Sequence, residues 1–202
     1  MKLKNVFLLL IVLFLFISFS QDNNVVEINK LEEVNKYIKE NNYSNYCILV
    51  DFSKSTSSKR FILYNIETNQ IIYSCKCAHG NDGSQEIEAD INSFSNEVNS
   101  HKSSLGKFKI GNKRTINSID GIISVKSLKI PCYELHGLDK TNSNAYIRGI
   151  LIHPDYFLSN YSIPILPGHS FGCFSIPKKS FDIISNYIDK ETKPVLLISY
   201  YI

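Results

Sequence analysis

The alternation of apolar and polar positions changes character along the 202-residue chain, beginning with an apolar N-terminal run. Positions 6–19 are apolar or small and follow Lys2 and Lys4. A basic start, an apolar stretch and the small residues of Ser18-Phe19-Ser20 are typical of an export signal. A helix over this run would reach about 21 Å, short of the ~30 Å hydrocarbon core of a membrane. Residues 1–20 are therefore predicted to be a signal peptide, with an uncleaved N-terminal anchor as the alternative.

A helical period follows a short polar lead. The spacing predicts a helix over residues 30–41, with Asn29 able to cap it and Glu32 three residues further on, as in a capping box. Its apolar positions share one face: Leu31, Val34 and Ile38. We expect this helix to carry no chemistry.

From residue 46 the period becomes that of short strands. The predicted strands are 47–52, 60–66, 71–77, 107–110, 121–125, 132–135, 146–152 and 194–201. The first three follow one another closely, which predicts an antiparallel meander. A second helix is predicted over 180–189, with Phe181, Ile184 and Ile188 on one face. The pattern favours a mostly-β (α+β) domain with helices at its periphery.

These elements divide the chain into a signal peptide over 1–20, an N-terminal lead and helix over 21–45, and one domain over 46–202. Within that domain, residues 81–104 are mostly polar, with few apolar positions. Such a stretch is either a plain surface loop or a loop that faces a substrate, because long loops in compact domains are often functional.

Composition narrows the function classes. A hydrophobic fraction of 44% with twelve Tyr and twelve Phe is enough to bury one core. The formal net charge is +3, and it is closer to neutral once Lys2 and Lys4 are removed with the signal. A near-neutral chain gives no case for nucleic-acid binding.

Five cysteines in an exported chain raise the question of disulfides. If Cys173 is reactive, Cys47, Cys75, Cys77 and Cys132 remain. They either form bridges, in one of three connectivities, or are small buried apolar side chains in strands. The pair Cys75 and Cys77 has no second pair at metal-ligand spacing, so no zinc site is expected.

The stretch from His153 to Cys173 contains a candidate nucleophile. Thiolate is the reactive form of cysteine, and a neighbouring imidazolium lowers the pKa of a thiol. Gly172 removes side-chain bulk beside Cys173, so a substrate carbonyl and backbone N–H groups can approach closely. The alternatives are a buried core cysteine and a structural histidine.

This stretch also resembles a known signature. A His, about sixteen intervening residues and then Ser/Thr-x-Gly-Cys is similar to the motif of bacterial L,D-transpeptidase catalytic domains, which cross-link peptidoglycan. Further blocks stand in the order of the family's murein-specific branch: Phe94-Ser95-Asn96, Ser103-Ser104-Leu105-Gly106, Leu135-His136-Gly137-Leu138 and Ala145-Tyr146-Ile147-Arg148. The resemblance covers about residues 46 to 176 and implies a mixed β-sandwich with peripheral helices and a nucleophile near the end of a strand.

The resemblance implies roles for the matching residues. Cys173 is the expected nucleophile, His153 the base, and the N–H groups around Gly172 and Cys173 the oxyanion donors, with Ser170 completing the motif. The residues expected to bind substrate are Ser104, His136, Arg148 and His169. Arg148 is expected on a strand, where it either clamps a carboxylate or forms a surface ion pair. His169 either binds a carboxylate or caps the turn, and His136 shapes the cleft.

Two positions depart from the family pattern. Pro154 stands where Gly is usual after the His, and Phe171 stands where many members have His. These departures keep a non-catalytic wall-binding or scaffold protein open as an alternative. A papain-like protease is disfavoured because the His here precedes the Cys.

The resemblance thus implies an exported cysteine transpeptidase of the periplasm or cell envelope, acting on peptidoglycan stem peptides with release of terminal D-alanine. An L,D-carboxypeptidase on the same site is the nearest alternative. No cofactor, metal or membrane contact beyond export is expected. Carbapenem β-lactams are the expected covalent inhibitors.

Overall fold

The computed structural model describes residues 31–80, 93–119, 123–124, 129–156, 158 and 169–202. The chain divides into two compact units, Met1–Asn41 and Asn42–Ile202. In the first unit residues 31–40 are helical, which confirms the predicted helix. The predicted signal peptide lies outside the described residues. No helix within the described ranges is long and apolar enough to span a bilayer.

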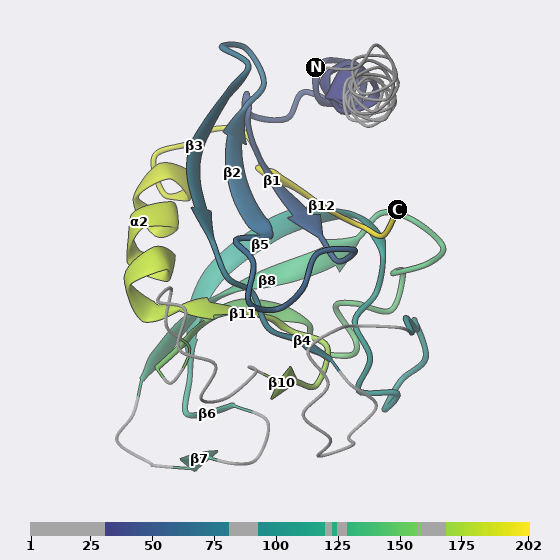
Figure 1. Cartoon of the computed structure of the whole chain (residues 1–202), viewed down its shortest axis with the longest axis vertical. Helices are drawn as coiled ribbons and strands as arrows, with labels where there is room; N and C mark the ends of the chain where they lie inside the picture. The colour runs from purple at the N-terminus through teal and green to yellow at the C-terminus, as the bar shows by residue number, and fades with distance from the viewer. Residues whose placement is uncertain (1–30, 81–92, 120–122, 125–128, 157, 159–168) are drawn as a thin grey trace, which may run out of the picture. The chain divides into compact units, whose positions relative to one another are not determined.

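The second unit is built on an eight-stranded mixed sheet in the order β11-β9-β8-β5-β12-β1-β2-β3 (Figure 1). Its strands are β1 (Tyr46–Asp51), β2 (Phe61–Asn65), β3 (Gln70–Cys75), β5 (Gly106–Ile116), β8 (Ile130–Gly137), β9 (Leu151–Asp155), β11 (Phe174–Pro177) and β12 (Leu196–Tyr200). Two small sheets pair β4 (His79–Gly80) with β10 (His169–Ser170), and β6 (Ser118–Ile119) with β7 (Ile123–Ser124). One helix, α2 (Lys178–Ile188), follows β11 directly.

The predicted meander is confirmed, because β1, β2 and β3 pair antiparallel in sequence. The centre of the sheet joins distant parts of the chain. β1 lies between β2 and β12 and pairs in parallel with β12, which brings Cys47 opposite Leu196. β12 in turn pairs antiparallel with β5.

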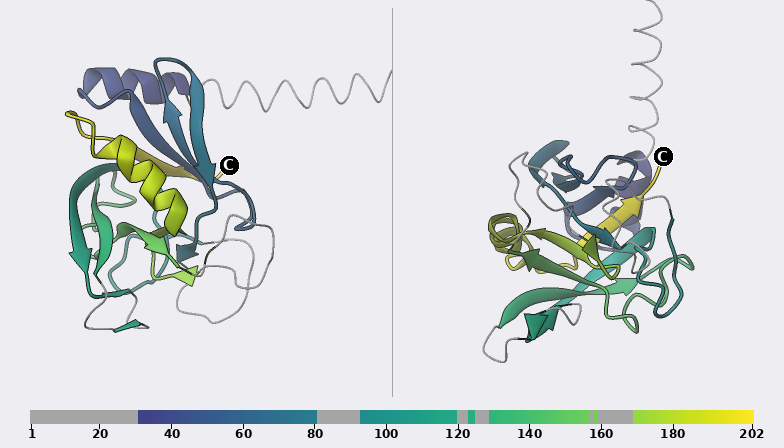
Figure 2. Two further views of the ribbon diagram at one scale, coloured as in Figure 1. Left: turned by 90° about the vertical axis from the view of Figure 1, so that its left-hand side faces the viewer. Right: turned by 60° about the horizontal axis from the view of Figure 1, so that its bottom comes forward.

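The two ends of the sheet run in different directions and share one core (Figures 1 and 2). A register shift between Ile110 and Lys113 in β5 marks a bulge, which increases local twist and bends a strand. The buried core draws on both ends, from Phe61 and Leu63 in β2 to Ile152 in β9 and Phe174 beside it. The mostly-β fold class with a mixed sheet is therefore confirmed.

Helix α2 agrees with the helix predicted over 180–189. Pro177 stands at its N-cap with φ −51°, where a proline has no helical hydrogen bond to lose. Phe181 and Ile184 are buried in the shared core, and the Phe181 ring lies 5.7 Å from that of Tyr133. Figure 2 shows the helix alongside the strands that carry this core.

Two strand predictions need correction. The strand predicted over 107–110 extends to Ile116 as β5. The strand predicted over 146–152 is wrong in its first half, because residues 141–149 form successive turns and β9 begins at Leu151. The backbone N–H of Arg148 donates to the Asn144 carbonyl at 2.8 Å, and Gly149 has a φ of +68°. Of the strand predicted over 121–125, Ile123–Ser124 is a strand and the rest lies outside the described residues.

Strands β8, β9 and β11 separate two faces, because successive side chains of a strand point to opposite sides. The side chains of one face are buried in the core: Tyr133, Leu135, Ile152, Phe174 and Ile176. The alternate positions lie on the other face: Cys132, Glu134, His136, Leu151, His153, Cys173 and Ser175. Cys132, Leu151 and Cys173 pack together in a separate small cluster, as this alternation requires. We call this second face the site face.

Candidate functional site

Cys173 immediately precedes β11 and is 8% exposed. It lines a cavity of about 250 Å³. Its Sγ lies 3.7 Å from the Gly149 carbonyl oxygen, a distance at which a thiol can donate a weak hydrogen bond. The structure thus gives the predicted nucleophile a space that a substrate could enter.

His153 lies on β9, one strand away from Cys173. The parallel register of β9 and β11 places Ile152 opposite Phe174 and His153 opposite Ser175. Cys173, two residues before Ser175, packs with Leu151, which lies two residues before His153 on β9. The imidazole and the thiol therefore lie on the site face as diagonal neighbours.

The backbone fixes the tautomer of His153. Its Nδ1 lies 3.1 Å from the Pro154 carbonyl oxygen, which can only accept a hydrogen bond. Nδ1 therefore carries the proton, and Nε2 of this buried ring is the basic nitrogen. Pro154 departs from the family pattern, yet its carbonyl orients the imidazole. A nitrogen that can accept a proton is what proton abstraction from a thiol requires.

Ser170 and Gly172 shape the turn that leads to the candidate nucleophile. Ser170 is buried, and its hydroxyl donates to the Cys173 carbonyl oxygen at 2.7 Å. Gly172 has a φ of +105°, which L side chains rarely adopt. A Cβ at this position would lie 2.8 Å from the Ile150 side chain and 2.8 Å from the Lys102 carbonyl oxygen. Glycine is therefore required here by conformation and by space.

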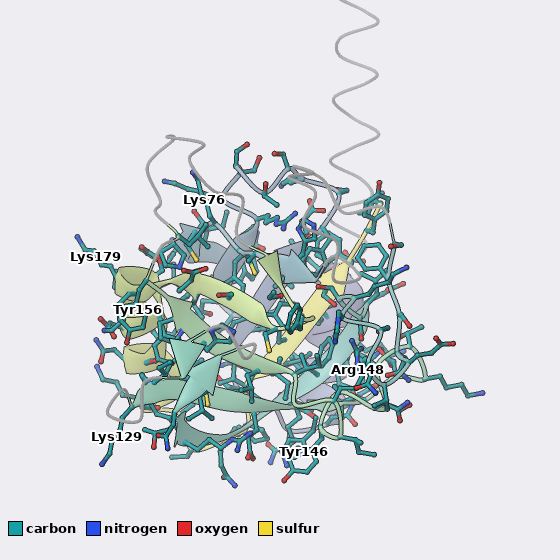
Figure 3. The ribbon with its side chains drawn as sticks, turned by 90° about the horizontal axis from the view of Figure 1, so that it is seen from below. Lys76, Lys129, Tyr146, Arg148, Tyr156 and Lys179 are labelled. Carbon is teal, nitrogen blue, oxygen red and sulfur yellow. The ribbon has the colours of Figure 1, made fainter. Side chains whose placement is uncertain are left out.

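Arg148 lies in the turns before β9, and not on a strand as predicted. Its Nη1 donates to the Ser95 carbonyl at 2.7 Å and to the Ser104 hydroxyl at 2.6 Å. Its Nη2 donates to the Lys102 carbonyl at 2.5 Å and to the Ser100 hydroxyl at 3.2 Å. Figure 3 shows Arg148 projecting into the face of the domain seen from below, with Tyr146 at its edge. The guanidinium therefore holds one segment, residues 93–104, against the turns.

Asn96 holds the same segment from the other end. Its side-chain amide donates to the Lys140 carbonyl at 3.0 Å and to the Ser143 hydroxyl at 2.9 Å. The backbone N–H of Asn144 donates back to the Asn96 side-chain oxygen at 2.9 Å. The 93–104 segment is thus held in place at both ends, and we call it the wall of the cavity.

The tip of this segment forms part of the cavity. His101 stacks on Phe171 with ring centroids 4.4 Å apart and an interplanar angle of 23°. His101 and Asn99 both have positive φ, at 55° and 64°, in a region that costs non-glycine residues about 1–2 kcal/mol each. The cavity is lined by Val98, Asn99, His101, Ile147, Arg148, Gly149, Phe171 and Cys173.

The predicted substrate-binding residues have different places. Arg148 lines the cavity, and Ser104 is buried behind it, where its hydroxyl also donates to the Ser95 carbonyl at 2.7 Å. His136 lies on β8 as predicted but does not line the cavity, and its ring stacks on Tyr146 at 4.7 Å. The backbone of His169 pairs with His79, whereas its side chain lies outside what the structure describes.

The buried Arg60 holds the strand β4 in place. Arg60 donates twice to the Cys77 carbonyl, at 3.1 and 2.8 Å, and its Nη2 lies 2.7 Å from Nδ1 of His79. Because a guanidinium only donates, Nδ1 of His79 accepts. His79 belongs to β4, and its partner β10 ends at Ser170, three residues before Cys173. Arg60 thus fixes the strand pair that leads into the nucleophile turn.

The other four cysteines are buried thiols. None of the five cysteines, all of which are described, forms a disulfide. Burial raises the pKa of Cys47 and Cys77 to about 12. This agrees with their interpretation as small apolar side chains. Within the described ranges, no group of three or more His, Cys, Asp or Glu is placed to hold a metal.

Sequence reasoning missed the aromatic stack and the anchors of the wall. His101 carries no motif of its own, and Phe171 stands out in the sequence only as a departure from the family pattern. The Phe94-Ser95-Asn96 block was the available signal, because Asn96 holds the wall in place.

A family model described as the L,D-transpeptidase catalytic domain matches residues 20–198. The chain therefore belongs to the L,D-transpeptidase catalytic-domain family, as the resemblance predicted. None of the curated proteins matches the chain significantly.

Several solved structures are similar to the chain at low identity. An L,D-transpeptidase from Xylanimonas cellulosilytica is 13% identical with a TM-score of 0.42, and covers 78% of this chain and 61% of its own. The helical cell shape determining protein Pgp2 from Campylobacter jejuni is 17% identical with a TM-score of 0.40, covering 79% and 49%. L,D-transpeptidase 3 from Mycobacterium tuberculosis, in complex with a faropenem-derived adduct, is 12% identical with a TM-score of 0.39, covering 77% and 60%. The chain spans less than two thirds of each of these structures, and the family assignment rests on the family model.

Proposed function

We propose that this protein is an exported cysteine L,D-transpeptidase that acts on peptidoglycan stem peptides. Family membership supports the reaction class. The observation that carries the proposal is the position of Cys173 on the wall of a cavity, with His153 on the same sheet face one strand away. A thiol with an adjacent oriented imidazole is the arrangement that activates a cysteine nucleophile.

In the first half of the reaction, Nε2 of His153 takes the Cys173 proton and the sulfur attacks the carbonyl before the terminal D-alanine. The S–C bond forms, the C–N bond breaks, and His153 returns the proton to the leaving amine. Backbone N–H groups around Gly172 and Cys173 stabilise the oxyanion. The product is a thioester on Cys173 and free D-alanine.

In the second half, an amine of a neighbouring stem attacks the thioester. The new amide C–N bond forms, the C–S bond breaks, and the amine proton passes through His153 to the sulfur. If water replaces the amine, the same residues perform L,D-carboxypeptidase chemistry. The 93–104 segment, which Arg148 holds through Ser104, is the proposed substrate-facing surface.

Acylation by a carbapenem tests the proposal. The full chain is incubated with meropenem, and its intact mass is measured. We expect one covalent adduct that maps to Cys173 and is abolished by Cys173→Ala. Cys132→Ala, which removes the thiol packed in the same small cluster, is the matched control and should keep the adduct. A folded wild-type chain without an adduct would instead support the scaffold alternative.

A disaccharide-tetrapeptide then separates the two enzymatic outcomes. Cross-linked dimer is expected from the transpeptidase, and tripeptide alone from the carboxypeptidase. Export is tested in a bacterial host by cell fractionation and by the mass of the mature protein. A fully cytoplasmic product that keeps residues 1–20 would contradict the proposed signal.

A further inference from the structure

Arg148 carries a positive charge that no described carboxylate neutralises. Among the described residues, its four hydrogen bonds go to neutral acceptors, two carbonyl oxygens and two serine hydroxyls. Its Nε is buried and has no hydrogen-bond partner among the described residues. Neutral acceptors hold a guanidinium in place without cancelling its charge, so the charge acts on its surroundings.

That charge lies beside the candidate nucleophile. Arg148 and Cys173 line the same cavity, and Nη2 of Arg148 lies 3.1 Å from the position a Cβ of Gly172 would take. The carbonyl that faces Sγ belongs to Gly149, the residue after Arg148. Burial lowers the pKa of Arg148, and the charge of Cys173 acts on that pKa in the opposite direction.

We propose that Arg148 is a positioning residue with two tasks: it fixes the 93–104 segment, and its uncompensated charge holds Cys173 in the thiolate form. This inference rests on the proposed role of Cys173 as the nucleophile. It proposes an interaction inside the protein where the sequence left open a carboxylate clamp or a surface ion pair.

A fixed charge solves a conflict within a cysteine–histidine pair. An imidazolium stabilises a thiolate, but it has no lone pair with which to accept a proton. A guanidinium stays charged at every pH a protein tolerates. With Arg148 in place, the thiolate does not depend on a charged His153, so the imidazole that has taken the Cys173 proton can give it to the leaving amine and then accept one from the attacking amine.

The elements packed around Cys173 carry other titratable groups. They are His153 and Asp155 on β9, Glu134 on β8, and His101 and Lys102 on the 93–104 segment. Glu134 is paired with Arg114 at 3.1 Å, so most of its field is cancelled. Asp155 accepts from the Ser175 hydroxyl at 3.5 Å, at the far end of β9 from Cys173. Neither acid lines the cavity.

The test is the pH profile of Cys173 alkylation by iodoacetamide on the folded full chain, read by peptide mass. In Arg148→Gln we expect the rate at pH 6–7 to fall about tenfold, because loss of a nearby opposite charge raises a thiol pKa by about one unit. The limiting rate at high pH should be unchanged. Arg148→Lys keeps the charge and should keep the profile near that of wild type.

A second pair of variants leaves Arg148 in place. Ser100→Asp should neutralise the guanidinium while it keeps the hydrogen bond to Nη2, and should shift the profile in the same direction as Arg148→Gln. Ser100→Asn is the neutral control and should leave the profile unchanged. If Arg148→Gln does not fold, Ser100→Asp and Ser100→Asn still test the inference.

Two results would overturn the inference: wild-type profiles in Arg148→Gln and Ser100→Asp, or equal shifts in Ser100→Asp and Ser100→Asn. Equal shifts would mean that the effect passes through the geometry of the wall. The assay uses no peptidoglycan, so it is independent of the transpeptidase proposal. A low thiol pKa that depends on Arg148, in a chain inert towards stem peptides, would reject the proposed function and keep the inference.

Discussion

The two faces of β8, β9 and β11 show how adjacent residues take opposite tasks. Ile152 and Phe174 are fully buried in the core, whereas their neighbours His153 and Cys173 lie on the site face. The core face is apolar and is filled by α2 and the opposite end of the sheet. The site face carries a thiol, an imidazole and an ion pair, and opens to a cavity.

The difference teaches that stability and chemistry can be separated here at single-residue resolution. A core-face substitution removes packing, and a site-face substitution removes a reactive group while the core stays intact. If variants of the two faces lose stability and activity alike, the two faces do not have separate tasks.

The largest effect is expected on the site face. His153→Gln should slow carbapenem acylation by about 10²–10⁴-fold, because a general base is lost. Its free energy of unfolding should change little. Ile152→Val, one residue away, is the control: it should lose about 1 kcal/mol of stability and keep the acylation rate. Equal acylation rates in His153→Gln and wild type would remove His153 from the mechanism.

The converse result is expected at Phe174, next to the nucleophile. Phe174→Ala should lose about 3–5 kcal/mol of unfolding free energy in urea denaturation, because a fully buried aromatic ring is removed. Cys173→Ala should lose far less while it abolishes acylation. A Phe174→Ala variant as stable as Cys173→Ala would show that the core face has no special packing role.

Gly172 belongs to neither face, and its replacement should affect both properties. Gly172→Ala should lower the free energy of unfolding by about 1–3 kcal/mol and slow acylation. The backbone has a positive φ that alanine rarely adopts, and the new Cβ would have contacts under 3 Å. Gly149→Ala is the matched control, with positive φ but nothing within 4 Å, and should lose about 1 kcal/mol. Similar acylation rates in the two variants would exclude a steric role for Gly172.

The last prediction concerns the pH dependence of stability, and it leaves the acylation rate unchanged. In the folded protein Cys47 has a pKa of about 12, whereas an unfolded thiol ionises near pH 8.5. Between these values the unfolded chain binds fewer protons, so stability falls as pH rises, by about 1.4 kcal/mol per unit for each such thiol. Cys47→Val should flatten this slope in urea denaturation between pH 9 and 11. An unchanged slope would mean that Cys47 is ionised in the folded state.

Much of the sheet could be predicted from sequence because strand periodicity is local. The meander of β1 to β3, helix α2 and the last strand follow from apolar spacing. The strand predicted over 146–152 failed because Ala145, Tyr146 and Ile147 read as apolar, whereas Tyr146 and Ile147 are more than half exposed in a turn. Turn hydrogen bonds to Asn142 and Asn144 decide that region, and apolar spacing does not report them.

The candidate site was predictable only where residues form a motif. Cys173, His153 and Gly172 could be named from the sequence, and the structure brings Cys173 and His153 to one face. The wall of the cavity could not be named, because His101 and Phe171 meet only through tertiary structure. The charge environment of Cys173 could not be predicted either, because it depends on which acceptors Arg148 meets.

The pairing of β1 with β12 has a consequence for how the protein is made. Cys47 lies opposite Leu196, so the middle of the sheet cannot close until nearly the whole chain is available. Pairings between such distant segments slow folding, because the entropy cost of closing a large loop comes before the stabilising contacts form. The reactive centre is therefore expected to be latent in nascent or C-terminally truncated chains and to mature only after synthesis is complete.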